Sequence, residues 1–370
     1  MTTSEAAAAR AVEEESSSPA ENQEIEGIVR RPHGPLVLGI FAALLLVGLV
    51  AGVAIGPLRL APLDVLDIIA SKVGIGEAAG YSVAEVNVVW EIRFPRVLLA
   101  TLVGSALAIS GAALQGLFGN SLADPGIIGV TAGASLGAIT AIVLGLTIFG
   151  SWTVPGMAFV FGLATTGLIY VLARPGQGRG TVQLLLVGIA ITAIAGSANG
   201  FFTYIADTTE LESITYWSMG SLNRASWTTL VTGLPLYVTG MVTVLCLARS
   251  LDVLALGERQ AHHVGLHVKR TRILLIVATA LVVGAAVALA GSIGFVGLVV
   301  PHIVRLLVGP GHRWLLPISA LGGALMLVMA DIGARTLNPP SEVPIGLFTG
   351  LVGGPFFLWL LFHRRTEMRA

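Results

Sequence analysis

Uninterrupted apolar runs long enough to cross a lipid bilayer constrain this chain more than any other feature. The first run covers residues 36–55, directly after a polar N-terminal segment that ends with Arg30 and Arg31. About 20 apolar residues in a helix span the hydrocarbon core of a membrane. Only 11% of the residues are charged, whereas a soluble domain carries roughly 25%. The chain is therefore expected to be an all-α, polytopic membrane protein, because helices satisfy their own backbone hydrogen bonds in lipid.

The apolar pattern predicts about ten transmembrane helices. They are expected at residues 36–55, 97–118, 127–149, 154–173, 182–204, 230–248, 273–290, 293–308, 314–332 and 343–362. This arrangement puts most basic residues in loops on one side, which is typical of the cytoplasmic side. Both termini are then cytoplasmic, with residues 1–34 a disordered tail, residues 35–363 the membrane domain and residues 364–370 a short C-terminus.

Two long connections on the other side are expected to contain short helices. Leu63, Leu66 and Ile69 recur at helical spacing within residues 56–91. Tyr216 and Trp217 place aromatic rings where an interfacial belt is expected. Both segments are predicted to lie along the outer surface of the membrane.

Residues 249–272 form a polar interruption between two apolar blocks. The segment has five Arg or Lys and two carboxylates, so it is expected to face the cytoplasm. It is longer than a turn between spans requires. It is either a solvated basic connector or a docking surface for a cytoplasmic partner.

The chain offers little catalytic chemistry of its own. Its only lysines, Lys72 and Lys269, do not follow a glycine, so there is no GK[ST] phosphate loop and any ATP must be bound by another chain. Residues 133–137 match GxSxG, but Ser135 is predicted mid-helix, which disfavours an intramembrane hydrolase with His302. The net charge of zero and the single cysteine give no support for a nucleic-acid partner or a cysteine metal cluster.

Three histidines in the polar segment could in principle bind a metal. His262, His263 and His267 have helical spacing, but no carboxylate or cysteine completes a ligand set, so a surface location is favoured. No metal or other cofactor is therefore expected on this chain.

Arg93, Arg96 and Arg335 are expected at the outer ends of spans, against the usual preference of basic residues for the inside. They could pair with Glu91 and with Asp331, one helical turn from Arg335. They could equally form a basic outer rim that receives an acidic protein or ligand. The sequence leaves both interpretations open.

Several motifs, in order, resemble the FecCD-type permeases, the membrane subunits of ABC importers for iron chelates, haem and cobalamin. The motifs lie between residues 36 and 362. They are Ile92–Arg96, the Gly104–Gly126 run that ends in Leu-Ala-Asp-Pro-Gly, Leu254–Glu258, Gly294–His302, Ala330–Arg335 and Pro344–Gly346.

The resemblance implies a type II importer permease in a bacterial inner membrane, with no catalysis of its own. It implies a second permease subunit in a homodimer, a cytoplasmic ABC ATPase dimer that binds ATP, and an extracytoplasmic substrate-binding protein. By matching position, Arg93, Arg96 and Arg335 would dock the binding protein. Residues 249–272 would be the coupling loop. Its predicted ATPase contacts are Leu254, Ala255, Leu256, Gly257, Glu258, Ala261, Gly265 and Leu266.

The resemblance also implies a cytoplasmic gate at Asn120, Leu122 and Thr181, although Ser121 stands where the family usually has proline. The expected cargo is an iron complex, haem or a ferric siderophore, with haem slightly preferred and cobalamin the alternative. An ion-coupled secondary transporter is the alternative from another class. It would fit an inverted repeat relating residues 104–111 to residues 284–291, each with a Gly pair seven apart.

Overall fold

The computed structural model describes residues 33–76, 80–173, 180–339 and 341–367, with the side chains of 180, 181 and 360–367 outside that description. Within these ranges the chain is helical, and the polar segments between helices are short. The predicted disordered tail lies almost wholly outside the described residues.

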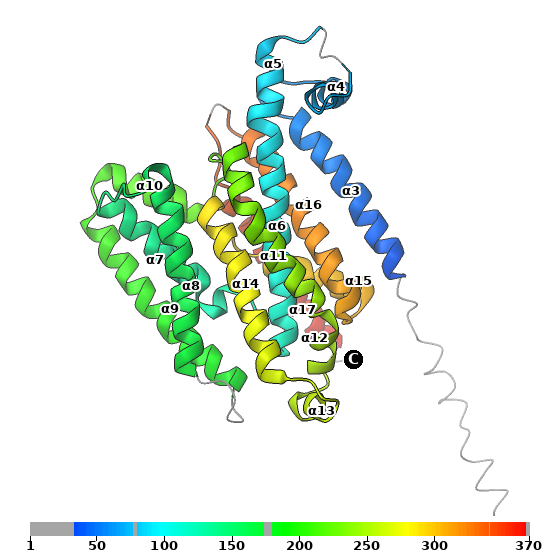
Figure 1. Cartoon of the computed structure of the whole chain (residues 1–370), viewed down its shortest axis with the longest axis vertical. Helices are drawn as coiled ribbons and strands as arrows, with labels where there is room; N and C mark the ends of the chain where they lie inside the picture. Colours follow the sequence, from blue (N-terminus) through cyan, green and yellow to red (C-terminus); the bar gives the residue numbers. More distant parts are fainter. Residues whose placement is uncertain (1–32, 77–79, 174–179, 340, 368–370) are drawn as a thin grey trace, which may run out of the picture.

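Ten apolar helices are present where the sequence predicts membrane spans (Figure 1). In the described part of the chain, seven are long and apolar enough to cross a membrane, and three are shorter. The ten are α3 (Gly34–Ala54), α6 (Phe94–Phe118), α7 (Val130–Val143), α8 (Thr153–Ala173), α9 (Gly180–Ile205), α11 (Trp227–Cys246), α14 (Val268–Ala290), α15 (Val296–Val308), α16 (His312–Thr336) and α17 (Ile345–Glu367).

The third predicted span, residues 127–149, is wrong at both ends. The 3-10 helix η2 (Pro125–Ile128) precedes it, and Gly129 at φ 75° separates η2 from α7. Helix α7 ends at Val143, and Gly145 shortly after it adopts φ 58°, a left-handed conformation that favours glycine and commonly ends a helix.

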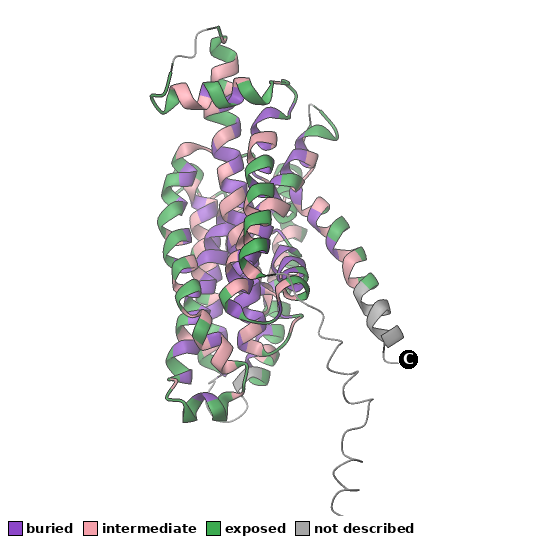
Figure 2. Cartoon of the chain, turned by 90° about the vertical axis from the view of Figure 1, so that its right-hand side faces the viewer, coloured by how far each residue is buried: buried purple, intermediate pink, exposed green. Residues whose placement is uncertain are grey.

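Helix α6 forms the centre of the bundle, packed against α14, α15 and α16. In its most apolar stretch 78% of the residues are buried, against 17% for α9, which lies at the edge of the molecule (Figure 1). Buried residues gather in the interior of the bundle, where they are drawn in purple in Figure 2. A central helix of this kind is apolar on every side because it contacts other helices all round.

Glycines bring these helices into backbone contact. A Cβ atom added to Gly104 of α6 would overlap the carbonyl oxygen of Gly323 of α16, and one added to Gly111 would overlap the carbonyl oxygen of Gly297 of α15. Gly133 and Gly137 bring α7 equally close to α8, since Cβ atoms at these positions would collide with the α8 backbone.

Short helices mark the two ends of the bundle (Figure 1). Helices α4 (Pro62–Lys72), α5 (Val83–Asn87) and α10 (Thr208–Met219) lie at one end, which we call the α10 end; the π-helical turn η1 (Val88–Arg93) joins α5 to α6. Helices α12 (Ala248–Leu254) and α13 (Glu258–His263) lie at the opposite end, the α13 end. The short helices predicted within residues 56–91 and 205–226 are thus confirmed.

Candidate functional site

The α12–α13 segment is a compact helical corner at the α13 end. Two buried side chains, Leu251 of α12 and Ala261 of α13, anchor it to the bundle. Gly257 at φ 107° and Gly265 at φ 82° make the turns on either side of α13, a conformation that a residue with a Cβ rarely adopts. The corner is therefore a defined surface and not a slack loop.

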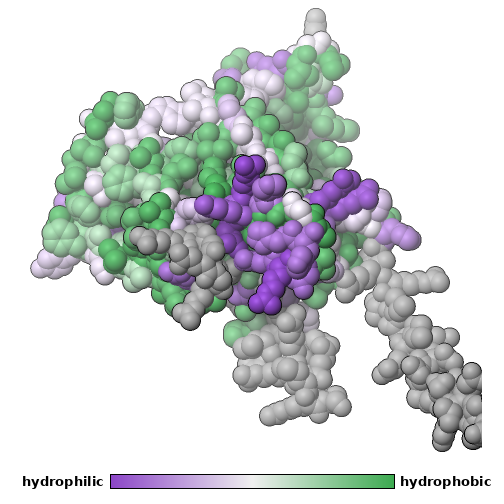
Figure 3. All heavy atoms as spheres, turned by 60° about the horizontal axis from the view of Figure 1, so that its bottom comes forward, coloured by the Kyte–Doolittle hydropathy of each residue, from purple (hydrophilic) through white to green (hydrophobic). Residues whose placement is uncertain are grey.

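Apolar side chains project from this polar corner. Leu256 is 68% exposed and Val264 69% exposed, although the surrounding face is hydrophilic (Figure 3). Apolar groups rimmed by polar residues are typical of protein interaction sites. The eight predicted ATPase contacts divide into Ala255, Leu256, Glu258 and Gly265, which are exposed, Leu254, Gly257 and Leu266, which are partly buried, and Ala261, which is buried.

Two charged contacts fasten the corner to spanning helices. The carboxylate of Glu258 accepts a hydrogen bond from the guanidinium of Arg272, near the start of α14. Asp252 of α12 accepts from the backbone N–H of His312 at 2.8 Å, and the same oxygen lies 2.7 Å from His312 Nδ1. Sequence reasoning missed the Asp252–His312 contact, because nothing local relates residues 60 positions apart.

Two of the three predicted gate residues, Asn120 and Leu122, lie in a turn at the α13 end. Asn120 and Leu122 occupy the turn after α6, where the Asn120 side chain accepts from the Leu122 N–H at 2.9 Å and Leu122 is exposed. Asp124 accepts from the Gly126 N–H at 2.8 Å, which lowers its pKa, but burial has the larger effect and raises it.

Thr181 lies in the first turn of α9, and its side chain is not described. The turn after α6 reaches α9 through Ile127, whose carbonyl oxygen closely approaches Gly188. The structure thus brings η2, which follows the Asn120–Leu122 turn, beside α9, about two helical turns beyond Thr181.

The three arginines predicted for the outer rim lie at the α10 end, but they are buried. Arg93 is 4% exposed, Arg96 6% and Arg335 5%. Arg96 Nε donates to Asp331 Oδ1 at 2.9 Å, and its two terminal nitrogens donate to Glu342 at 2.8 and 2.7 Å. Arg335 Nε lies 3.0 Å from Asp331 Oδ2, which confirms the pair predicted from their spacing.

Arg93 and Arg335 also bind the end of α3. Arg93 donates to the carbonyl oxygens of Val53 and Ala54 at 2.9 and 3.0 Å, and to that of Leu58. Arg335 donates to the carbonyl oxygen of Gly52 at 2.8 Å. The carbonyls of Gly52, Val53 and Ala54 belong to the last turn of α3, whose carbonyls an α-helix leaves unpaired, so the two cations complete the end of this helix.

Of the two interpretations that the sequence left open for these arginines, the structure supports pairing for their guanidinium groups. Burial drives each one to an internal acceptor, since an unpaired buried charge is costly. The suggested partner Glu91 makes no ion pair among the described residues, whereas Glu342, which the sequence did not single out, does. Whether a partner protein contacts this region is a separate prediction.

The hydrolase alternative lacks its geometry. Ser135 lies in the regular helix α7, so the strand-to-helix turn that exposes such a nucleophile is not there. His302 of α15 faces the rings of Phe356 and Phe357 of α17, with centroids 6.1 and 6.4 Å away. His262, His263 and His267 are exposed on the corner, as the surface interpretation expects.

Comparison with known proteins gives a consistent result. Residues 44–363 match the model of the FecCD transport family. The hemin transport system permease protein HmuU of Yersinia pestis is 46% identical over 289 residues, which is 75% of this chain and 84% of that protein. The cobalamin import system permease protein BtuC of Halobacterium salinarum is 44% identical over 284 residues, 76% of this chain and 75% of that protein.

A solved structure shares the fold. A metal-chelate type ABC transporter in an inward-facing conformation superposes with a TM-score of 0.78 at 32% identity, covering 89% of this chain and 99% of that one. The PsaBC complex of Streptococcus pneumoniae bound to a Fab matches with a TM-score of 0.53 at 16% identity, covering 72% and 89%, so it supports the fold alone.

Proposed function

The chain belongs to the FecCD transport family and is a membrane permease of an ABC importer, and on that premise we propose that it carries haem, or a ferric siderophore, inward. The observation that carries the choice of cargo is the 46% identity to a hemin permease over three quarters of the chain. Cobalamin is the second candidate, supported by the 44% identity to a cobalamin permease. The permease supplies the path, and the energy comes from ATP hydrolysed by a separate subunit.

The α12–α13 corner is the proposed docking surface for the cytoplasmic ATPase dimer. Its exposed apolar side chains Leu256 and Val264 and its fixed glycine turns support this role. The links Glu258–Arg272 and Asp252–His312 would pass movement of the corner to α14 and α16. Under this proposal the α13 end and both termini would lie in the cytoplasm of a bacterium, and the α10 end would lie outside its inner membrane.

At the α10 end we propose that the substrate-binding protein docks over the buried arginine network. Arg93, Arg96 and Arg335 would act mainly by fixing the positions of α3, α6 and α16 at that surface, because their guanidiniums already have internal partners. Glu342, which is only partly buried, is the member of the network that a docked partner could contact. The gate assigned to Asn120, Leu122 and Thr181 would close the opposite end.

The ion-coupled transporter remains the alternative from another class, and the charge distribution disfavours it. Such a transporter needs an intramembrane carboxylate free to bind an ion or proton. Asp331, the carboxylate expected deep in a span, is held by both Arg96 and Arg335. The proposed repeat does not decide between the two classes. Gly104 of α6 lies against α16 and Gly284 of α14 approaches Phe159 of α8, which is the packing expected if α6 and α8 repeat as α14 and α16.

The cargo is tested by reconstituting the permease with its ATPase and binding protein in liposomes. Haem, a ferric siderophore and cobalamin are offered in turn, and uptake and ATP hydrolysis are measured. We expect ATP-dependent uptake of an iron complex. Uptake of cobalamin and of neither iron complex would show that cobalamin is the cargo. Uptake driven by an ion gradient without ATP would contradict the importer mechanism.

Docking at the corner is tested by Leu256→Glu, which puts a charge at the centre of the proposed interface. We expect the ATPase to co-purify at least tenfold less, a loss of about 1.4 kcal/mol in binding free energy. Lys72→Glu, at an exposed position of α4 at the opposite end of the bundle (Figure 1), is the control and should co-purify with the ATPase like wild type. Equal co-purification of Leu256→Glu and wild type would remove this surface from the interface.

A further inference from the structure

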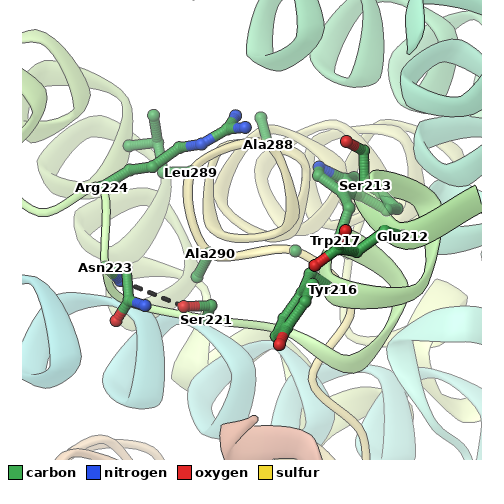
Figure 4. A pocket seen from close by; sticks show the side chains of 11 residues that line it. Glu212, Ser213, Tyr216, Trp217, Ser221, Asn223, Arg224, Ala288, Leu289 and Ala290 are labelled. Carbon is green, nitrogen blue, oxygen red and sulfur yellow. Dashed lines mark hydrogen bonds between the residues drawn. The ribbon is translucent and has the colours of Figure 1, made fainter. Parts of the chain in front are cut away.

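A pocket opens at the α10 end between α10, the loop after it and the last turn of α14 (Figure 4). Its volume is about 290 Å³, at the lower limit of small-molecule sites, which are roughly 300–1,000 Å³. Glu212, Ser213 and Trp217 line it from α10, and Leu289 lines it from α14. Arg224 closes it from the loop.

The walls of this pocket are fixed by backbone contacts. The Ser221 N–H donates to the Ala290 carbonyl at 2.8 Å, and the Ile345 N–H donates to the Gly220 carbonyl at 3.1 Å. Gly220 and Gly291 adopt φ 74° and 72°, and Gly291 lies against the Trp217 carbonyl too closely for a Cβ. The α10 loop is thus joined to α14 and α17, so the pocket is preformed.

The backbone of Arg224 is fixed by a hydrogen bond to the start of α11. Its carbonyl oxygen accepts from Thr229 Oγ1 at 3.1 Å, within the first turn of α11, where Ser226 is the N-cap. Its guanidinium extends over Leu289 and Ala288 toward Ser213 (Figure 4). In the part of the chain that the structure describes, Arg224 forms no ion pair, unlike the three buried arginines at this end.

The pocket therefore combines an unpaired cation with an apolar wall. Arg224 can bind a carboxylate through two parallel hydrogen bonds. Leu289, Ala288 and the Trp217 ring border the same space and suit the apolar part of a ligand. Glu212 lies on the α10 wall, across from the backbone of Arg224, and would repel a ligand carboxylate that approached it.

We propose that this pocket binds a carboxylate-bearing arm of an amphipathic cargo as it enters the permease, with the carboxylate on Arg224 and the adjoining apolar atoms on Leu289 and Trp217. The small volume suits an arm and not a whole metal chelate. The inference rests on the proposed import of an iron complex. Haem, whose two propionates are such arms, is the probe for its test.

The test uses the full chain in lipid nanodiscs and measures haem affinity by equilibrium titration. Arg224→Gln should raise Kd about 5- to 10-fold, the effect of losing one partly exposed charge-assisted contact. Glu212→Gln should lower Kd about twofold by removing a like charge. Arg59→Gln, another exposed arginine at the α10 end, is the matched control and should leave Kd unchanged. Haem dimethyl ester, which lacks free carboxylates, should bind wild type and Arg224→Gln equally.

Two results would overturn the proposal that this pocket binds a carboxylate. One is equal haem affinity in Arg224→Gln and Arg59→Gln, and the other is an ester that still distinguishes wild type from Arg224→Gln. Uptake by the complete reconstituted importer is measured separately. A wild-type importer that takes up no haem, although the nanodisc protein binds haem through Arg224, would overturn the proposed cargo and support the pocket. Haem uptake by the wild-type importer, together with an unchanged haem affinity in Arg224→Gln, would support the proposed cargo and overturn the pocket.

Discussion

At the scale of single residues, Asp331 is the most consequential side chain at the α10 end. It is 1% exposed, and its two oxygens face Arg96 and Arg335. Burying three charges costs solvation, and the cost is recovered only while each keeps its partners. One carboxylate thus holds α6 against α16, and through Arg335 it also reaches the end of α3.

Replacing the Asp331 carboxylate should destabilise the protein strongly even where the new side chain has nearly the same volume. We expect Asp331→Asn to lower the free energy of unfolding by about 3 kcal/mol, because two buried guanidiniums lose their shared anion. Thermal unfolding in detergent measures the change. Glu91→Gln, an exposed carboxylate at the same end, is the control and should unfold with wild type. A similar melting temperature for both variants would show that the network contributes little.

Sequence spacing could predict only part of this network. Arg335 and Asp331 are one helical turn apart, so their pairing follows from the helix period. Arg96 and Glu342 are separated by 246 residues, and no local pattern brings them together. The sequence could not decide between pairing and an outer rim for the same reason, since burial depends on neighbours from distant helices.

At the scale of helices, backbone contacts between small residues decide how the bundle packs. Gly104 of α6 meets Gly323 of α16 with no side chain between them. Close approach of this kind gains dispersion energy, because lipid offers helices little hydrophobic reason to associate.

A single methyl group should disturb this contact. Gly104→Ala would overlap the Gly323 carbonyl oxygen, and we expect a loss of about 1–3 kcal/mol from overpacking. Gly39→Ala of α3 has open space around it and should be neutral or slightly stabilising, since Ala favours a helix. Thermal unfolding of the two variants gives the comparison. Equal stability would mean that α6 and α16 can separate without cost.

The existence of the ten apolar helices could be predicted because lipid permits few alternatives to long apolar helices. Their ends could not. Helix α7 stops at Val143 where glycines adopt left-handed φ, although apolar residues continue to Phe149. The pocket beside Arg224 was also beyond prediction, because it is formed by segments from residues 212–224 and 288–291.

At the scale of the whole molecule, burial is unevenly distributed. Helix α6 is mostly covered within the chain, whereas α9 has 17% of its most apolar stretch buried. An exposed apolar helix in a membrane can face lipid or a second subunit. We propose that the chain forms the homodimer that the family resemblance implies, with part of the α9 surface against the partner.

Cysteine cross-linking in membranes can detect that contact. In a Cys246→Ser background, we expect Ser197→Cys on α9 to give a cross-linked dimer in more than half of the protein when a short bifunctional maleimide is added. Gly39→Cys on α3, which is also exposed, should stay monomeric. Equal cross-linking at both positions would indicate random collision and contradict an interface at α9.

Helix α16 is fastened at both of its ends, by Asp252 at His312 and by Arg96 at Asp331. At about 1.5 Å per residue, its 25 residues make a rod of roughly 37 Å. Such a helix can transmit a displacement along its axis while its own secondary structure stays the same. A pull on α12 would therefore reach the opposite surface as a displacement of Asp331 and its arginines. Movements at the two faces of the membrane would then be coupled through α16. A partner that binds one end of this helix would restrict the movement of its opposite end.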